Sequence, residues 1–374
     1  MSEFKVSSME SSTGGAPSFT QGLNVAGADV TSGHGMSEYY TGATEPSSPA
    51  NGAFWFDGTD LHQYINGKFR ILDANPPPAW FGGRGVFGGG GGGNVIQYVT
   101  IDTPGNATDF GDLTSIYQDA YNGTAACSNG TYGLFGGATY FSYFNIIQYV
   151  TIATPGNAID FGDLTQARGN LASCSNGTYG LFGGGVSNTN IIDYVTIATP
   201  GNATDFGDLT QARARLASCS NGIYGLFAGG GSSSTNTGNI IDYVTIATPG
   251  NATDFGNLSV DRSGLGSCAN ITYGLFAGGS NGGTGKYNTI DYVTIATPSN
   301  ATDFGDLTVA RGNRDNTSVG SCSNSTRGIF GGGLSGSSTS EATIDYVTIA
   351  TPGNATDFGD LLSANAGPTA CSGD

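Results

Sequence analysis

The fold is decided by the stretch YVTIATPGNATDFGDL at residues 194–209, because close copies of it recur along most of the chain. Six copies begin at equivalent tyrosines, which follow one another at spacings of 51, 45, 49, 49 and 54 residues: Tyr98, Tyr149, Tyr194, Tyr243, Tyr292 and Tyr346. A period near fifty residues indicates a repeat architecture in which each copy is one supersecondary unit.

A complete copy contains four β-strand patterns and no helical periodicity. The run 191–197 is β-rich and nearly all apolar, which fits a strand covered on both faces. A Thr-Pro-Gly-Asn turn leads to a short strand around Phe206, and two further strands around Cys219 and Tyr224 are joined by Asn-Gly, a strong hairpin pattern. Four antiparallel strands repeated six times predict an all-β fold, a six-bladed β-propeller.

The two ends of the repeat region complement each other. The first copy begins at Arg84 and lacks the Cys strand, whereas the chain finishes on residues 370–374 and holds only that strand. We therefore expect the C-terminal strand to pair with the N-terminal hairpin and close the ring with three strands from one end and one from the other, which leaves no unpaired blade edge.

The spacings inside the repeat separate two faces of the ring. Each repeat Tyr precedes the following Phe by 12 residues in all six copies, and the Cys-to-glycine interval is also constant, whereas the two other connections vary in length. Alternating strand direction places the constant turns on one face and the variable loops on the other. Insertions tend to lie on a binding face, so we expect recognition on the variable side.

The repeat resembles the kelch-type propeller over residues 80–374. The likeness rests on the aromatic strand that ends in Phe182-Gly183-Gly184, the strand residue Tyr194, the outer-strand Phe206 and the following Arg213. The chain departs from kelch units by carrying Phe where they usually carry Trp. Some kelch-type oxidases bind copper through imidazoles, but the two histidines, His34 and His62, precede the ring, so we expect no metal, no cofactor and no catalytic residues.

The first 79 residues differ from the rest. Residues 1–50 are rich in Ser, Thr and Gly and suggest an extended arm, and residues 51–79 combine a predicted β-hairpin with the stiff linker Pro76-Pro77-Pro78. The hairpin, with Asn51-Gly52 and Asn66-Gly67, resembles small hairpins in fibre and appendage proteins of tailed bacteriophages, and glycine-rich repeats beside it resemble virion structural proteins of marine phages. The resemblance implies docking through its aromatic residues: Phe54, Trp55, Phe56 and Tyr64.

Composition and charge exclude several classes of function. The chain has 374 residues with 12 Lys plus Arg and 29 Asp plus Glu, a net charge of −17, which argues against nucleic-acid binding. No apolar signal-peptide core and no run of 18 apolar residues appear, so we expect neither secretion by that route nor membrane insertion. The six cysteines occupy one equivalent position per repeat, where we expect free thiols that pack between blades.

Features that are not repeated are the better candidates for a binding site. Blade two carries a run of aromatic residues in one variable loop, two tyrosines precede it in another, and several basic residues map to variable loops, which predicts a comparatively basic face. The candidate contact residues are Tyr117, Tyr121, Tyr140, Phe141, Tyr143, Phe144, Arg213, Arg215, Lys286, Arg311 and Arg314. The alternative is that the aromatics cover the rim and the arginines brace the loops.

The sequence thus favours a non-enzymatic virion structural protein, assembled in the host cytoplasm and present in multiple copies on a phage particle. Its partners would be other virion proteins, such as capsid, neck or tail subunits, or a host-surface glycan. One alternative is a soluble lectin-like propeller, which the loop aromatics favour, and a propeller enzyme is a second.

Overall fold

The computed structural model describes residues 82–91, 93–114, 123–139, 141–186, 189–231, 237–283, 285–312, 318–336 and 339–373, together with the backbone of six short strands between Leu23 and Ile71. The chain divides into two compact units, Met1–Pro76 and Pro77–Asp374, and the division falls inside the proline run. In the described part, no helix is long and apolar enough to cross a membrane.

The first unit contains two small sheets. Strands β1 (Leu23–Val25) and β2 (Ala28–Val30) are antiparallel, and the second sheet has the order β3 (Tyr39–Thr41), β4 (Phe54–Phe56), β5 (Leu61–Ile65) and β6 (Lys68–Ile71). Strands β4, β5 and β6 pair antiparallel, as a hairpin at 51–70 requires, but β3 adds a parallel strand from the segment expected to be an extended arm. The candidate docking residues form β4 and part of β5.

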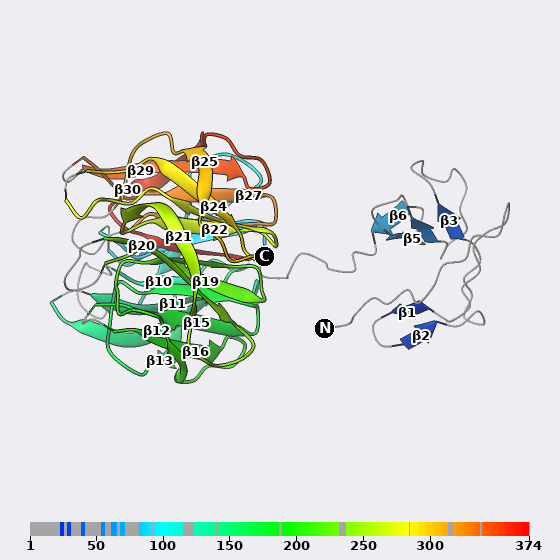
Figure 1. Ribbon diagram of the computed structural model, residues 1–374, viewed down its shortest axis with the longest axis horizontal. Coiled ribbons are helices and arrows are strands. Elements are labelled where there is room, and N and C mark those ends of the chain that lie inside the picture. Colours follow the sequence, from blue (N-terminus) through cyan, green and yellow to red (C-terminus); the bar gives the residue numbers. More distant parts are fainter. Residues whose placement is uncertain are drawn as a thin grey trace. The chain divides into compact units, whose positions relative to one another are not determined.

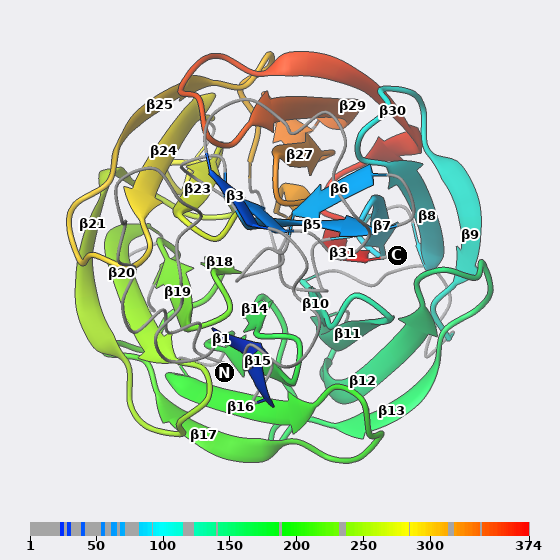
Figure 2. The same cartoon turned by 90° about the vertical axis from the view of Figure 1, so that its right-hand side faces the viewer.

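The second unit is a ring of six antiparallel sheets, each of which is one blade of a β-propeller (Figure 2). From the centre outward, blade 1 contains β31 (Thr369–Gly373), β7 (Arg84–Gly88), β8 (Val95–Thr100) and β9 (Thr108–Asp112). Blade 2 contains β10 (Ala125–Ser128), β11 (Tyr132–Thr139), β12 (Tyr143–Thr151) and β13 (Ile159–Asp163). Blade 3 contains β14 (Ala172–Ser175), β15 (Tyr179–Gly183), β16 (Ile191–Thr196) and β17 (Thr204–Asp208).

Blades 4 to 6 continue the ring with the same order of strands. Blade 4 contains β18 (Ala217–Ser220), β19 (Tyr224–Ala228), β20 (Gly238–Thr245) and β21 (Thr253–Arg262). Blade 5 contains β22 (Gly266–Ala269), β23 (Tyr273–Ala277), β24 (Thr289–Thr294) and β25 (Thr302–Asp306). Blade 6 contains β26 (Gly320–Ser323), β27 (Arg327–Gly331), β29 (Thr339–Thr348) and β30 (Thr356–Asn365), and the short β28 (Leu334–Ser335) pairs with β29. The predicted all-β fold and the number of blades are confirmed.

The ring closes through the C-terminal strand, as the complementary ends of the repeat region predict. Strand β31 pairs antiparallel with β7, and the register sets Cys371 opposite Val86 and Gly373 opposite Arg84. Blade 1 is therefore composed of three strands from the start of the ring and one from its end.

The hydrophobic core lies between neighbouring blades. In the cluster between blades 3 and 4, Leu181, Ile192 and Phe206 of one blade contact Phe227 and Val244 of the next, and all five side chains are buried. Strands such as β16 therefore have apolar side chains on both faces, which explains their continuous hydrophobic runs. Burial of this kind, repeated around the ring, holds each blade in a fixed place.

Two of the repeated glycines are required by close contacts between blades. Gly207 has a φ of 146° at the bulge between β16 and β17, and a Cβ there would meet the backbone of Gly250 in the next blade at 2.5 Å. A Cβ on Gly180 would lie 2.7 Å from the sulfur of Cys127. The turn residue Gly201 meets nothing within 4 Å, and Ser299 takes the same place in another copy, so that glycine is not required by space.

The six cysteines are free and buried, as expected. Each sulfur lies against the glycine near the start of the second strand of an adjacent blade, as Cys127 does against Gly180. Burial raises the pKa of all six thiols, to about 12 for Cys174 and Cys371. These thiols are packing groups in their neutral form and are poor nucleophiles.

The ring has the two faces that the spacings predict. The constant-turn face carries the turns between first and second strands and between third and outer strands, such as 176–178 and 197–203, and the variable-loop face carries the other connections, such as 184–190 and 209–216. The amide of Ile101, in a constant turn, donates to Gly83, so the chain joins the ring on the constant-turn face. The C-terminal end of the ring lies at this same face (Figure 1).

Candidate functional site

The arginines expected on the variable-loop face have their side chains inside the protein. Arg213 and Arg311 are buried, as are the equivalent Arg168 and Arg262, and each forms an ion pair with a fully buried Asp. The prediction that Arg213 and Arg311 contact a partner is therefore wrong, and the alternative that the arginines brace the loops describes them. Sequence reasoning located the loops correctly but gave the wrong direction for these side chains.

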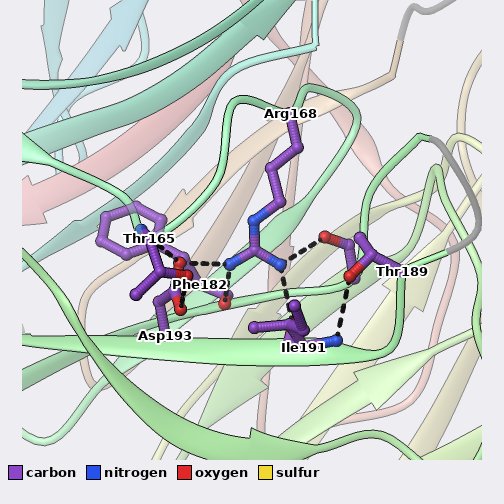
Figure 3. Close-up of polar contacts among 7 residues, drawn as sticks. Thr165, Arg168, Phe182, Thr189, Ile191 and Asp193 are labelled. Carbon is purple, nitrogen blue, oxygen red and sulfur yellow. Dashed lines mark hydrogen bonds and ion pairs between the residues drawn. The ribbon is translucent and has the colours of Figure 1, made fainter.

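The pair between Arg168 and Asp193 shows the geometry (Figure 3). The Nη2 atom of Arg168 lies 2.8 Å from Oδ2 of Asp193, and the guanidinium also donates to three backbone carbonyls, those of Phe182, Gly184 and Ile191, at 2.7–3.0 Å. The carboxylate accepts two further hydrogen bonds, from the amide and the hydroxyl of Thr165. One arginine on the connection that leaves blade 2 thus holds two strands of blade 3.

The ion pair recurs at three more blade junctions, although at one of them Arg311 donates to a single backbone carbonyl, that of Phe330, and its Nη1 is buried without an acceptor. The distances from Nη2 to Oδ2 are 2.8, 2.8 and 2.9 Å in the pairs Arg213–Asp242, Arg262–Asp291 and Arg311–Asp345. Burial lowers the pKa of each guanidinium, and the adjacent carboxylate opposes that change. The Nε atom of each arginine is buried without an acceptor, so the pairs are held at some cost in desolvation.

The two junctions that flank blade 1 have no such ion pair, and their sequence differs accordingly. The position of the buried Asp is occupied by Gln97 in blade 1 and Gln148 in blade 2, and the corresponding arginine positions hold Asn365 and Tyr117. Gln148 accepts the same two hydrogen bonds, from the amide and hydroxyl of Thr114, at 2.7 and 2.6 Å. A carboxylate occurs at this buried position only where an arginine reaches it, because an unpaired buried charge is costly.

Among the described residues of the variable-loop face, an aromatic hairpin carries the most exposed apolar side chain. Strands β11 and β12 of blade 2 are longer than the matching strands β15 and β16 of blade 3, and their tip carries Phe141, 91% exposed, and Tyr143, 43% exposed. Phe144 is half-buried and lies opposite Ala138, close to the tip of this hairpin. The other aromatic candidates, Tyr117, Tyr121 and Tyr140, and the basic candidate Arg314 lie outside the described residues.

Two basic candidates keep a place near the surface of the variable-loop face. Arg215 is half-buried, has a φ of 62°, which is rare for a residue with a side chain, and leaves its Nε without an acceptor. Lys286 is half-buried and its backbone bridges to Ser280. Since four arginines are neutralised internally, the described part of this face is not the basic surface that the sequence suggested.

Negative charge gathers on the outer strands of the ring. Eleven aspartates occupy two equivalent positions there, and Asn257 takes the twelfth: Asp109, Asp112, Asp160, Asp163, Asp205, Asp208, Asp254, Asp303, Asp306, Asp357 and Asp360. These side chains are exposed or half-buried. An acidic outer rim opposes close contact between neighbouring molecules and disfavours pairing of exposed strand edges.

Serines cap the inner strands at the centre of the ring, a role that the sequence analysis did not assign. The hydroxyl of Ser175 donates to the carbonyl of Ser128 in the preceding blade at 2.7 Å. Equivalent bonds are made by Ser128, Ser220, Ser323 and Ser372 at 2.6–2.8 Å, and Ala269 breaks the ring of bonds at its sixth position. Each serine thereby satisfies a carbonyl on a strand edge that has no neighbouring strand.

Two adjoining cavities of about 60 and about 90 Å³ lie among the inner strands. They are lined largely by serine, threonine and small side chains, and each has room for a few water molecules. Within the described residues, no group of three or more His, Cys, Asp or Glu side chains could hold a metal ion. The centre of the ring is therefore a narrow polar space and does not offer a pocket for a drug-sized ligand.

Fold and surface together define a β-propeller of the kind that supports contact with a protein or another ligand. The chain matches no known protein family, and no curated protein is similar to it in sequence. The likeness to kelch repeats and to phage structural proteins therefore stays a prediction from the residues quoted above.

Proposed function

We propose that this chain is a non-enzymatic structural protein of a tailed-phage virion. In this proposal the N-terminal unit docks onto other virion subunits, and the ring presents its variable-loop face to a partner subunit or to the host surface. One structural observation carries the idea of presentation: the chain joins the ring on the constant-turn face, opposite the variable loops. The resemblance of the hairpin at 51–70 to phage appendage proteins supports the assignment of the chain to a phage particle.

Rigidity of the ring suits such a role. Four buried Arg–Asp pairs and the serine caps fix the blades against one another, so a contact made on one loop is held at a constant orientation. The exposed Phe141 and Tyr143 form the contact surface that we assign to a partner, because aromatic side chains dominate binding energy at protein interfaces.

Mass spectrometry of purified particles tests the virion proposal directly. We expect the chain in stoichiometric amounts, and its absence from particles that carry the gene would overturn the proposal. Two variants separate docking from presentation. Trp55→Ser should reduce incorporation into particles, whereas Phe141→Ser should be incorporated normally and impair attachment to the partner or host.

A second candidate is a glycan-binding module, which the same two exposed aromatic residues favour because aromatic rings stack on sugars. A glycan array probed with the purified full-length chain tests it. Binding that is lost in Phe141→Ala and Tyr143→Ala, and kept in the control Ile159→Ala, would support this function. Ile159 is a suitable control because it is 54% exposed on the outer strand of the same blade. Absence of binding to every glycan would refute it.

A further inference from the structure

We propose that blade 1 carries the force when the ring is pulled from its N-terminal side. In this blade the hydrogen bonds of β7 to β8 and β31 are loaded in shear, and Arg84 ties β7 to blade 2. This inference goes beyond the proposed function, because it concerns the response of the isolated chain to force. It would hold or fail whichever partner the ring has.

The path of the chain into the ring is the first observation. The segment that precedes β7 lies so close to the C-terminal strand that a Cβ on Gly82 would clash with the carbonyl carbon of Gly373. The carbonyl of Gly83 accepts a hydrogen bond from Ile101 at 2.7 Å, which extends the pairing of β7 with β8. Tension that is applied at Gly82 therefore passes directly into β7.

The position of β7 between two partners is the second observation. Five residues of β7, from Arg84 to Gly88, pair with β31 on one side and with β8 on the other. The strand starts at the constant-turn face and runs toward the variable-loop face. When the ring is held at its variable-loop face and pulled from the N-terminus, the force is directed along β7. All of its paired residues are then loaded together.

Arg84 is the third observation, because the repeat changes there. Blades 2 to 5 have tyrosine at this position, and all four of those residues make edge contacts with the tyrosine of the third strand, as Tyr179 does with Tyr194. Arg84 instead stacks over Tyr98, with its Cζ 4.6 Å from the ring centroid, and Nη1 donates to the carbonyl of Ile152 in blade 2 at 2.7 Å. The first residue of the loaded strand is thereby tied to the neighbouring blade.

Arg327 provides a matched comparison in blade 6. It stacks over Tyr346, with its Cζ 4.4 Å from the centroid, and Nη1 donates to the carbonyl of Ile101 at 2.9 Å. The two arginines therefore make the same kinds of contact across the two junctions that lack an Arg–Asp pair. Only Arg84 lies on the strand that receives the load, and this difference allows a sharp test.

The experiment is single-molecule force spectroscopy on the full chain in two pulling geometries. One geometry uses the N-terminus and a thiol handle at Ser142→Cys, an exposed position on the variable-loop face, where the six native thiols do not compete because they are buried with raised pKa. The other uses the N-terminus and the C-terminus. Because Arg84 and Gly373 are opposite each other, the second geometry separates β7 from β31 one pair at a time.

We expect a severalfold higher rupture force in the first geometry than in the second. In the first geometry, Arg84→Tyr should lower that force, and the control Arg327→Tyr should leave it unchanged. Arg84→Tyr is expected to fold, because tyrosine occupies the same place in four other blades. Equal forces in the two geometries would overturn the proposal even if neither variant were soluble. An unchanged force in Arg84→Tyr, or an equal decrease in Arg327→Tyr, would overturn the role of Arg84.

Discussion

Replacement of Arg262 by Met should leave a carboxylate stranded inside the protein. Both side chains of the pair Arg262–Asp291 are fully buried, and Nη2 lies 2.8 Å from Oδ2. Met retains most of the length of the side chain but donates no hydrogen bond. The change removes the ion pair and three hydrogen bonds to carbonyls, while Asp291 keeps only the hydrogen bonds from Ser259.

The expected loss follows from the cost of an unpaired buried charge. Removal of one partner of such a pair costs about 3–5 kcal/mol. The unfolding entropy is about 2.1 cal/mol/K per residue, so a unit of roughly 300 residues has an unfolding entropy of about 0.6 kcal/mol/K. A loss of about 4 kcal/mol therefore lowers the melting temperature by about 6 °C.

A second substitution tests the cause of that loss. Asp291→Gln in the same variant reproduces the neutral arrangement of Gln148, which accepts the same pair of hydrogen bonds from a neighbouring hydroxyl residue. We expect the double variant to regain most of the lost stability in urea denaturation and calorimetry. Arg215→Met serves as the control, because Arg215 takes part in no such ion pair. A double variant no more stable than Arg262→Met would refute the explanation by an unpaired charge.

Three further predictions concern packing and pH. Ala269→Ser should complete the ring of serine caps by donating to the carbonyl of Ser220, and should raise the free energy of unfolding by about 0.5–1.5 kcal/mol in urea titrations; a decrease would show that the sixth position is not equivalent. Gly180→Ala should cost about 1–3 kcal/mol because its Cβ meets the sulfur of Cys127 at 2.7 Å, and Cys127→Ala should suppress that cost; additive losses would contradict the contact. Burial raises the pKa of the thiols above the unfolded value, so the folded state binds more protons than the unfolded state at alkaline pH. Under reducing conditions the free energy of unfolding should therefore fall as the pH rises above about 8.5. The expected loss is about 1.4 kcal/mol per thiol at pH 9.5. Denaturation at pH 7.5 and pH 9.5 measures this loss of unfolding free energy. Cys174→Ala should make the loss between the two pH values smaller by the contribution of one thiol, and an equal loss in the variant and the unchanged chain would argue against the explanation.

Much of the fold follows from the sequence because the repeat states it six times. The regular tyrosine and phenylalanine positions predict the third and outer strands, and the complementary ends predict the pairing of β31 with β7. The constant and variable intervals also predict the two faces correctly. These inferences succeed because strand order, turn length and ring closure are properties of the backbone path, which periodicity reports directly.

The direction of individual side chains was harder to predict. A charged residue in a polar connection is usually solvated, so Arg213 and Arg311 were expected at the surface, although both turn inward to a buried Asp. A comparison among the repeats contained the missing information. Gln97 and Gln148 replace the Asp in the two blades where no Arg is available, and this correlation indicates a contact between the two positions.

The Arg–Asp pairs also constrain how the number of blades can change. Each pair joins two consecutive units, with the arginine supplied by one unit and the carboxylate by the next. Duplication or loss of a whole unit among blades 3 to 5 therefore leaves an arginine facing an aspartate at every junction that has such a pair. The same event beside blade 1 would leave an arginine facing Gln97 or a carboxylate with no cation. Blades on the side of the ring opposite its closure should therefore tolerate duplication or loss, whereas blade 1 and its two neighbours should be retained when the number of blades changes.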